Sequence, residues 1–210
     1  MGYAFGFRAV KRRCAVDLSS LWLPIDDRQA LAILKAKGFR VIEADVVAFA
    51  RKLIGKARYE FKARYSQAPQ VVNCSRLVKW VYARRGIWVP RIAVEQRTVG
   101  TPVPPDDLRA GDLVFKTAPR FNYYLDDPAD QVGHVGLATG QGTIIHAANA
   151  LRGVIESDVQ AFTRPSVFRG ARRIIRDPDR TFTLICPSER EVETSSQLRW
   201  IILQSLPRDP

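Results

Sequence analysis

Three stretches of the sequence carry apolar residues at the spacing of an amphipathic helix: residues 26–38, 45–55 and 74–85. Gly38 and Gly55 follow the apolar residues of the first two stretches, and glycine is the residue that most often ends a helix. The pattern therefore predicts two helices before residue 56 and a third helix later in the chain.

The third predicted helix has the clearest signals at its two ends. Asn73 is a preferred N-cap residue, and Gly86 lies at the position after a helix where glycine is favoured. Cys74 therefore falls in the first turn of this helix. Unpaired backbone N–H groups and the helix dipole stabilise a thiolate there, so we expect the pKa of Cys74 to be lower than that of a free cysteine.

Short apolar runs typical of β-strands dominate the second half of the chain. They lie at residues 113–115, 132–139, 143–147, 172–175 and 181–185. Gly140-Gln141-Gly142 separates the second run from the third, which predicts a β-hairpin. Helices followed by antiparallel strands predict an α+β fold.

The chain contains two histidines, and both lie in the predicted hairpin. With a three-residue loop, Gly136 pairs with His146, and His134 lies two residues further along on the same face. A two-residue loop would instead place the two imidazoles on opposite faces of the sheet. A cysteine at a helix start, with two histidines on one strand face, is the set that acyl transfer through a thiol needs.

Composition narrows the range of partners. The chain has 210 residues, and 33 Lys and Arg against 21 Asp and Glu give a net charge of +12. Such a charge favours polyanionic partners, but no nucleic-acid-binding motif accompanies it, so we expect no nucleic acid partner. The apolar runs are far shorter than the roughly 20 residues of a transmembrane helix, so none is expected.

Three cysteines are too few for a disulfide scaffold. Cys14 and Cys186 have no histidine nearby in the sequence and no clear helix start, so we expect both to be structural. The cysteines show no CxxC spacing, and no Gly-rich phosphate loop occurs. We therefore expect neither a metal site nor a cofactor.

The first 44 residues contain one predicted helix and few other signals. They are near the lower limit for independent folding, so we expect 1–44 to be an N-terminal helical extension packed on a catalytic domain of residues 45–210. No Sec signal is recognisable at the N-terminus. This predicts a protein that is cytoplasmic or is exported by a route that reads no such signal.

Several short motifs follow one another in a characteristic order over residues 45–176. They are Tyr59-Glu60-Phe61, Asn73-Cys74-Ser75-Arg76, Val89-Pro90-Arg91, Glu95-Gln96, Ala110-Gly111-Asp112-Leu113-Val114-Phe115, Gly133-His134-Val135-Gly136 and Ile145-His146-Ala147. In this order and spacing the chain resembles the NlpC/P60 family of papain-like cysteine peptidases, which cut peptidoglycan stem peptides.

The resemblance implies a role for each of these residues. Cys74 would be the nucleophile, His134 the general base and acid, and His146 the residue that orients His134. Tyr59 would line the substrate cleft. The fold would be papain-like, with the helix that bears the nucleophile packed on a small antiparallel sheet.

The residues around Cys74 depart from the family pattern. Where the family has Asp-Cys-Ser-Gly, this chain has Asn73 before the cysteine and Arg76 after Ser75. The resemblance places Asn73, Ser75 and Arg76 with the substrate-binding residues. Arg76 suits a substrate carboxylate, or it is a solvated side chain on the helix face. Phe61-Lys62-Ala63 replaces the family's Trp-Gly-Gly.

The resemblance implies hydrolysis of the amide bond between D-glutamate and the diamino acid of a peptidoglycan-derived peptide. Two other functions remain open. The same thiol could act on another amide, ester or thioester as an acyltransferase or hydrolase, or the domain could be a catalytically silent, basic binding domain. The reactivity of the Cys74 thiol separates the last possibility from the first two.

Overall fold

The computed structural model describes four stretches of the chain: residues 6–119, 122–124, 126–127 and 131–207. These residues form two compact units. Unit 1 contains Asp45–Tyr82 and Val89–Arg176, and unit 2 contains residues 6–44, Ala83–Trp88 and 177–207.

This division differs in part from the one expected from the sequence. The first boundary between the units lies between Ala44 and Asp45. Residues 177–207, however, belong to unit 2 and not with the remainder of 45–210. The physical reason is strand pairing, because a strand from this C-terminal segment joins two strands from the first 44 residues.

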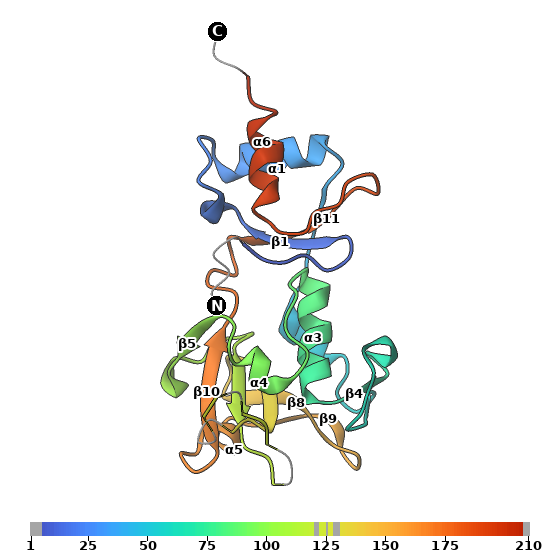
Figure 1. Ribbon diagram of the computed structural model, residues 1–210, viewed down its shortest axis with the longest axis vertical. Helices are drawn as coiled ribbons and strands as arrows, with labels where there is room; N and C mark the ends of the chain where they lie inside the picture. The colour runs from blue at the N-terminus through green and yellow to red at the C-terminus, as the bar shows by residue number, and fades with distance from the viewer. Residues whose placement is uncertain (1–5, 120–121, 125, 128–130, 208–210) are drawn as a thin grey trace. The chain divides into compact units, whose positions relative to one another are not determined.

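Unit 1 is built on a six-stranded antiparallel sheet. Its strands, in spatial order, are β5 (Thr101–Val103), β10 (Phe168–Arg173), β6 (Leu113–Lys116), β7 (His134–Ala138), β8 (Thr143–Asn149) and β9 (Gly153–Asp158). Figure 1 shows β5 and β10 side by side at one end of this series. The predicted strand at 172–175 is displaced, because β10 begins at Phe168 and ends at Arg173.

The hairpin of β7 and β8 has the predicted three-residue loop. Leu137 pairs with Ile145 and Ala138 with Ile144, and the Thr139 N–H donates to the Thr143 carbonyl at 3.0 Å. The loop glycines Gly140 and Gly142 both have φ of 76°, a conformation that glycine adopts without steric cost. The same-face placement of the two histidines is thereby confirmed.

Unit 1 also contains four α-helices and a small parallel pair of strands. They are α2 (Val46–Arg51), α3 (Cys74–Arg85), α4 (Ala93–Gln96), α5 (Gln160–Thr163), and the pair β3 (Arg58–Tyr59) and β4 (Val71–Val72). Of these helices, α3 extends by its last three residues into unit 2. The predicted helix at 45–55 is shorter than expected, because it continues after α2 only as turns. The predicted helix at 74–85 has the expected bounds.

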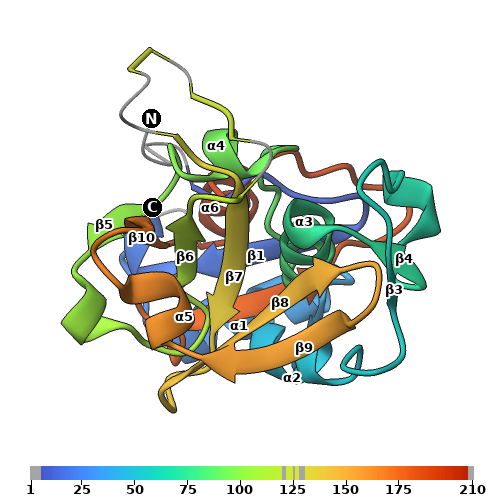
Figure 2. The ribbon, with the colours of Figure 1, turned by 90° about the horizontal axis from the view of Figure 1, so that it is seen from below.

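Two hydrogen bonds join α3 to the sheet of unit 1. The Tyr82 hydroxyl donates to the carbonyl of Gly111 at 2.5 Å, just before β6. At the other end, the Val135 N–H of β7 donates to the sulfur of Cys74. Figure 2 shows α3 beside β7 and β8 in unit 1. The structure therefore confirms an α+β fold in which this helix packs on an antiparallel sheet.

Unit 2 holds a three-stranded sheet and two helices. Its elements are β1 (Arg13–Asp17), the 3-10 helix η1 (Leu18–Leu21), α1 (Asp27–Ala36), β2 (Arg40–Ile42), β11 (Thr181–Ile185) and α6 (Gln197–Leu203). β11 is the central strand and pairs with β1 on one side and β2 on the other. The N-terminal segment is therefore not only helical, because two of its stretches are strands of this sheet.

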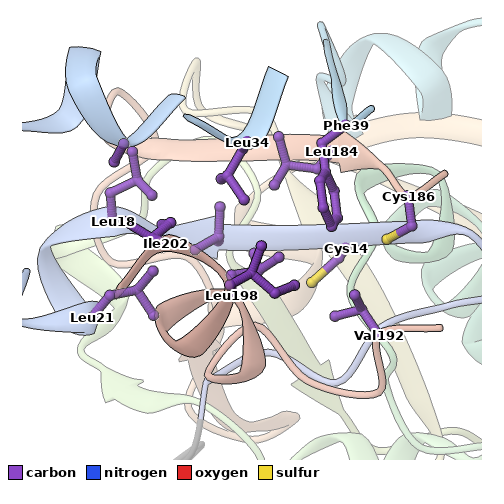
Figure 3. Close-up of a cluster of buried hydrophobic side chains, with 13 residues drawn as sticks. Cys14, Leu18, Leu21, Leu34, Phe39, Leu184, Cys186, Val192, Leu198 and Ile202 are labelled. Carbon is purple, nitrogen blue, oxygen red and sulfur yellow. The ribbon is translucent and has the colours of Figure 1, made fainter. Parts of the chain in front are cut away.

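Side chains from the strands and helices of unit 2 form one hydrophobic core. Figure 3 shows Cys14 of β1, Leu34 of α1, Leu184 of β11 and Leu198 of α6 converging there. Cys14 and Cys186 are buried in this core as free thiols. Burial, with a smaller effect of Cys186, raises the pKa of Cys14 to about 12, which agrees with the structural role expected for both.

Neither unit contains a helix that could cross a membrane, as far as the described residues extend. Across the same residues, no three His, Cys, Asp or Glu side chains gather into a group that could hold a metal ion.

Candidate active site

Cys74 is the first residue of α3, and its position follows from the N-cap. The side-chain oxygen of Asn73 accepts a hydrogen bond from the Arg76 N–H at 2.9 Å, and the Asn73 carbonyl accepts one from the Leu77 N–H. These bonds begin the helix at residue 74, as the sequence predicts. The backbone N–H groups of Cys74, Ser75 and Val135 all point at the Cys74 sulfur.

The pKa of Cys74 differs from the sequence-based expectation. Burial raises the pKa of the Cys74 thiol, whereas the three N–H groups lower it by favouring the thiolate. Burial outweighs them, so the pKa lies above the ordinary value and not below it. The helix position had predicted the favourable N–H groups correctly, but the cost of desolvation depends on what the rest of the chain packs around the sulfur.

The two histidines contact each other directly. His134 Nε2 and His146 Nδ1 lie 2.8 Å apart, and the two rings meet edge to face with centroids 5.0 Å apart. The β7–β8 register places both side chains on one face of the sheet. Val135, whose N–H reaches the Cys74 sulfur, is the residue next to His134. The structure thus brings His134 and His146 into contact and places the backbone N–H of the residue next to His134 at the Cys74 sulfur.

A fourth side chain continues this row of hydrogen bonds. His146 Nε2 lies 2.9 Å from the hydroxyl oxygen of Ser157 on β9. If His134 Nδ1 is to accept a proton, its Nε2–H must donate to His146 Nδ1, and the His146 Nε2–H must then donate to Ser157. His134 Nδ1 makes no hydrogen bond within the described part of the chain.

Both imidazoles are held in the neutral form. Burial is the main cause that lowers the pKa of His134 well below 6.5, with His146 and Lys116 adding to it. Burial also lowers the pKa of His146 to about 4, helped by the positive charges of Lys116 and Arg152. A buried neutral His134 is a proton acceptor at neutral pH, as a general base must be.

Phe162 of α5 supports both histidines from one side. Its ring centroid lies 5.6 Å from that of His134 and 4.9 Å from that of His146, and the side chain is fully buried. Gly136 makes room for it, because a Cβ at this position would lie 3.0 Å from the Phe162 ring and 2.2 Å from an Ile144 methyl group. The glycine of the His134-Val135-Gly136 motif therefore has a packing reason.

Tyr59 on β3 lies near the nucleophile, as expected. Burial is the main cause that raises the pKa of the Tyr59 phenol, and Cys74 raises it further, which places the two groups close together. β3 pairs with β4, and β4 ends just before Asn73. The short parallel pair thereby carries Tyr59 to the start of α3.

The polar side-chain atoms of Asn73 and Ser75 form hydrogen bonds within the local structure. The Asn73 amide nitrogen donates to the Phe61 carbonyl at 2.8 Å, and its oxygen accepts from the Ser75 hydroxyl at 3.2 Å as well as from the helix. Both residues thus tie the loop around Phe61 to the start of α3. Contact of either with a substrate stays a prediction.

Arg76 is not the solvated side chain that one of the two expectations described. It is only 7% exposed, and its Nε donates to the Ala63 carbonyl at 3.2 Å. Burial, and then the nearby Arg91, lower the pKa of its guanidinium. Among the described residues Arg76 forms no ion pair, so this buried cation has no carboxylate of the chain beside it.

Sequence reasoning missed Ser157 and Phe162, because it did not predict β9 or α5. It missed Lys116, because the predicted strand at 113–115 ended one residue before it. The β-branched residues Val154 and Ile155 after Gly153 were an available signal for a strand. Pairing that strand with 143–149 would have placed Ser157 diagonally from His146.

The motif residues of this site lie within a match to a known family. The sequence matches the NlpC/P60 family over residues 56–173, more than half of the chain. The chain belongs to this family. The NlpC/P60 match includes Tyr59, Cys74, His134 and His146, and most of unit 1.

Two curated relatives share the NlpC/P60 region. A probable endopeptidase of Corynebacterium glutamicum is 30% identical over 61% of this chain and 59% of its own length. A gamma-D-glutamyl-L-lysine dipeptidyl-peptidase of Bacillus subtilis is 35% identical over 36% of this chain and 23% of its own. The chain therefore spans less than two thirds of the length of these relatives.

A solved NlpC/P60 structure has the same fold. The family member from Bacillus cereus matches with a TM-score of 0.53 and 24% identity, and covers 64% of this chain and 41% of that one. The papain-like fold expected from the resemblance is thereby confirmed.

Proposed function

We propose that this chain is a cysteine peptidase that hydrolyses the amide bond between D-glutamate and the diamino acid of peptidoglycan stem peptides. The observation that carries the proposal is the row of contacts at the start of α3. It runs from Cys74, through the Val135 N–H beside His134, to the 2.8 Å contact of His134 with His146. Family membership and the names of the two relatives support the same substrate class.

The first half of the reaction forms a thioester. His134 Nδ1 takes the proton from the Cys74 thiol, and the sulfur attacks the γ-carbonyl carbon of the D-glutamyl residue. The Cys74 N–H at the start of α3 stabilises the negative oxygen of the tetrahedral intermediate. His134 then returns the proton to the nitrogen of the diamino acid, which leaves as a free amine.

The second half regenerates the thiol. A water molecule gives a proton to His134 and attacks the thioester carbon, and the proton on His134 then passes to the departing sulfur. Throughout both halves, His146 accepts from His134 Nε2–H and holds the ring in one orientation. Because burial raises the pKa of Cys74 and lowers that of His134, the resting pair is a neutral thiol and a neutral imidazole.

Arg76 is the best supported of the proposed substrate-binding residues. A buried guanidinium without a carboxylate beside it suits an acidic group of the substrate, and a stem peptide carries several carboxylates. Tyr59 is proposed to line the cleft on the other side of Cys74. We expect Arg76→Gln to raise KM for acidic stem peptides more than it lowers kcat.

A panel of defined stem peptides tests the proposed function. Mass spectrometry after incubation is expected to show the γ-D-glutamyl bond cut by the wild-type chain and intact after incubation with Cys74→Ala. Cys74→Ser is the matched control, because it keeps size and polarity but supplies a much weaker nucleophile. Peptide cleavage that survives in Cys74→Ala would refute the assignment. An intact panel with a Cys74 inert to iodoacetamide would favour a binding domain.

A further inference from the structure

Lys116 occupies the strand position directly opposite His134. The β6–β7 register pairs the two residues, so both side chains lie on the same face of the sheet. The side chain of Lys116 is half-buried. A charged ammonium group therefore shares a partly desolvated surface with the histidine that moves the proton.

Two contacts hold the ammonium group of Lys116 in place. Its Nζ donates to the carbonyl of Ala161 at 3.0 Å and lies 4.2 Å from the centroid of the Phe162 ring. A cation over an aromatic face is attracted by the ring, and the attraction grows as water is excluded. Phe162 is the same ring that packs on both His134 and His146. The charge is thus fixed beside the histidine pair and is not a mobile surface lysine.

Among the residues that the structure describes, no carboxylate forms an ion pair with the Lys116 ammonium. Glu156, next to Ser157 on β9, points to the other face of the sheet, where it contacts Thr143 and Arg51. The positive charge of Lys116 therefore acts on the two imidazoles without a neutralising partner.

The other groups that act on this cluster come from several elements. They are Arg152 between β8 and β9, which acts on His146 and Lys116, and Arg164 after α5, which acts on Lys116. Cys74 of α3 and Tyr59 of β3 lie close to each other, and burial raises the pKa of both, so both are neutral at neutral pH. The two arginines are exposed, so solvent screens them more than it screens Lys116. None of these neighbours favours a protonated imidazole by carrying a negative charge at neutral pH.

We propose that Lys116 is a positioning residue that acts through its charge: its fixed ammonium group adds to burial in keeping His134 and His146 neutral, so that His134 remains a proton acceptor in more acidic solution. The consequence for catalysis rests on the proposed function. The effect on the histidines does not, because it is measured on the imidazoles themselves.

Removing the charge changes the acid side of the pH profile. Without the ammonium, an imidazolium is repelled less, so the pKa of both histidines rises. Below that pKa the base is protonated and inactive, so the acid limb of kcat/KM moves to higher pH by roughly one unit. In solution more acidic than the wild-type acid limb we expect Lys116→Met to lose up to about tenfold in kcat/KM, with little loss at pH 8.

Three variants separate charge from packing. Lys116→Met removes the ammonium and keeps an unbranched side chain over Phe162. Lys116→Arg keeps the positive charge. Arg152→Gln removes an exposed charge that also acts on His146, and it serves as the matched control because solvent screens that charge.

The direct test is an NMR titration of the imidazole signals. His134 and His146 are the two histidines of the chain, so the side-chain spectrum contains two imidazoles to follow. We expect both to titrate at higher pH in Lys116→Met than in the wild type, little change in Lys116→Arg, and a smaller shift in Arg152→Gln. Equal titration of the wild type and Lys116→Met would overturn the proposal.

A pH profile of peptide cleavage completes the experiment and separates the two proposals. If no stem peptide is cut but the histidine signals move as expected, the proposed function fails and the role of Lys116 stands. If peptides are cut and the signals do not move, the role of Lys116 fails alone. A merely structural role would lower kcat/KM at every pH without moving its acid limb, and this too would contradict the proposal.

Discussion

The hydroxyl of Ser157 is the last group in a row of three hydrogen-bonded side chains behind the nucleophile. It lies 2.9 Å from His146 Nε2, and accepting that proton selects the tautomer of His146 that can support His134. Ser157 therefore acts on the orientation of His134 through two successive hydrogen bonds, with His146 between them. Such outer contacts commonly decide how well a catalytic imidazole is held.

Removal of this hydroxyl is expected to slow the reaction. In Ser157→Ala the His146 Nε2–H loses its acceptor, a bond worth about 1 kcal/mol, so kcat falls roughly fivefold with little change in KM. Ser157→Thr keeps a hydroxyl and is expected to retain most of the activity. Steady-state kinetics on a stem peptide decides between these results, and a Ser157→Ala variant with wild-type kcat would contradict the assignment.

The buried histidines make folding depend on pH. Unfolding returns His146 from a pKa of about 4 to its ordinary 6.5, so between these values the unfolded chain binds a proton that the folded chain does not. Stability is therefore lost as the pH falls through this window. From His146 alone we expect the free energy of unfolding to drop by about 2 kcal/mol between pH 7 and pH 5.

Urea unfolding at the two pH values measures this drop. In His146→Asn the residue at 146 no longer titrates, so the difference between pH 7 and pH 5 is expected to shrink. An unfolding free energy that is equal at pH 5 and pH 7 in the wild type would be inconsistent with two histidines buried in the neutral form.

Helix α3 is fixed at its start by Asn73, whose side chain makes bonds in two directions. Its oxygen caps the helix, and its nitrogen donates to the Phe61 carbonyl. We expect Asn73→Ala to lower the free energy of unfolding by about 1 kcal/mol through the lost cap. Asn73→Asp keeps the cap and favours the helix dipole but loses the bond to Phe61.

Thermal unfolding of the two Asn73 variants measures these contributions. The aspartate variant is expected to fall between the wild type and the alanine variant in stability. Equal stability of the alanine variant and the wild type would show that Asn73 does not fix the start of the helix.

The elements that the sequence predicts well are those with local signals. Asn73 and Gly86 mark the two ends of α3, and Gly140-Gln141-Gly142 sets the register that brings His134 to His146. The predicted strand at 172–175 does not coincide with β10, whose register with β6 shifts between Phe168 and Ala171. No local sequence pattern marks this irregularity. The predicted direction of the Cys74 pKa shift was wrong for a related reason, since burial is a property of tertiary packing.

The strand pairing of unit 2 could not be predicted, because the paired strands lie far apart in the sequence. β11 lies between β1 and β2, yet it follows them by more than a hundred residues, and period and propensity do not say which strands pair. The division at residue 44 followed composition and length alone. The expected domain of residues 45–210 therefore included residues 177–207, which the structure groups with unit 2.

Truncation after Arg176 is expected to unfold unit 2. It removes β11, the central strand, and leaves β1 and β2 without their shared partner and with unpaired edges. In an amide NMR spectrum, the signals of residues 6–44 should lose their dispersion. If those signals stay where they are in the full chain, residues 1–44 fold without the C-terminal segment, as an independent extension would.

The most direct test of the whole account is to trap the intermediate on Cys74. After rapid acid quenching of the wild-type chain with a stem peptide, intact-protein mass spectrometry should show the added mass of the γ-D-glutamyl part of the peptide, and fragmentation should place it on Cys74. Cys74→Ala should carry no such mass. Two results would contradict the central claim. One is an acyl group on a residue other than Cys74 after the diamino acid peptide has been released. The other is a Cys74→Ala variant that cuts the peptide as well as the wild type.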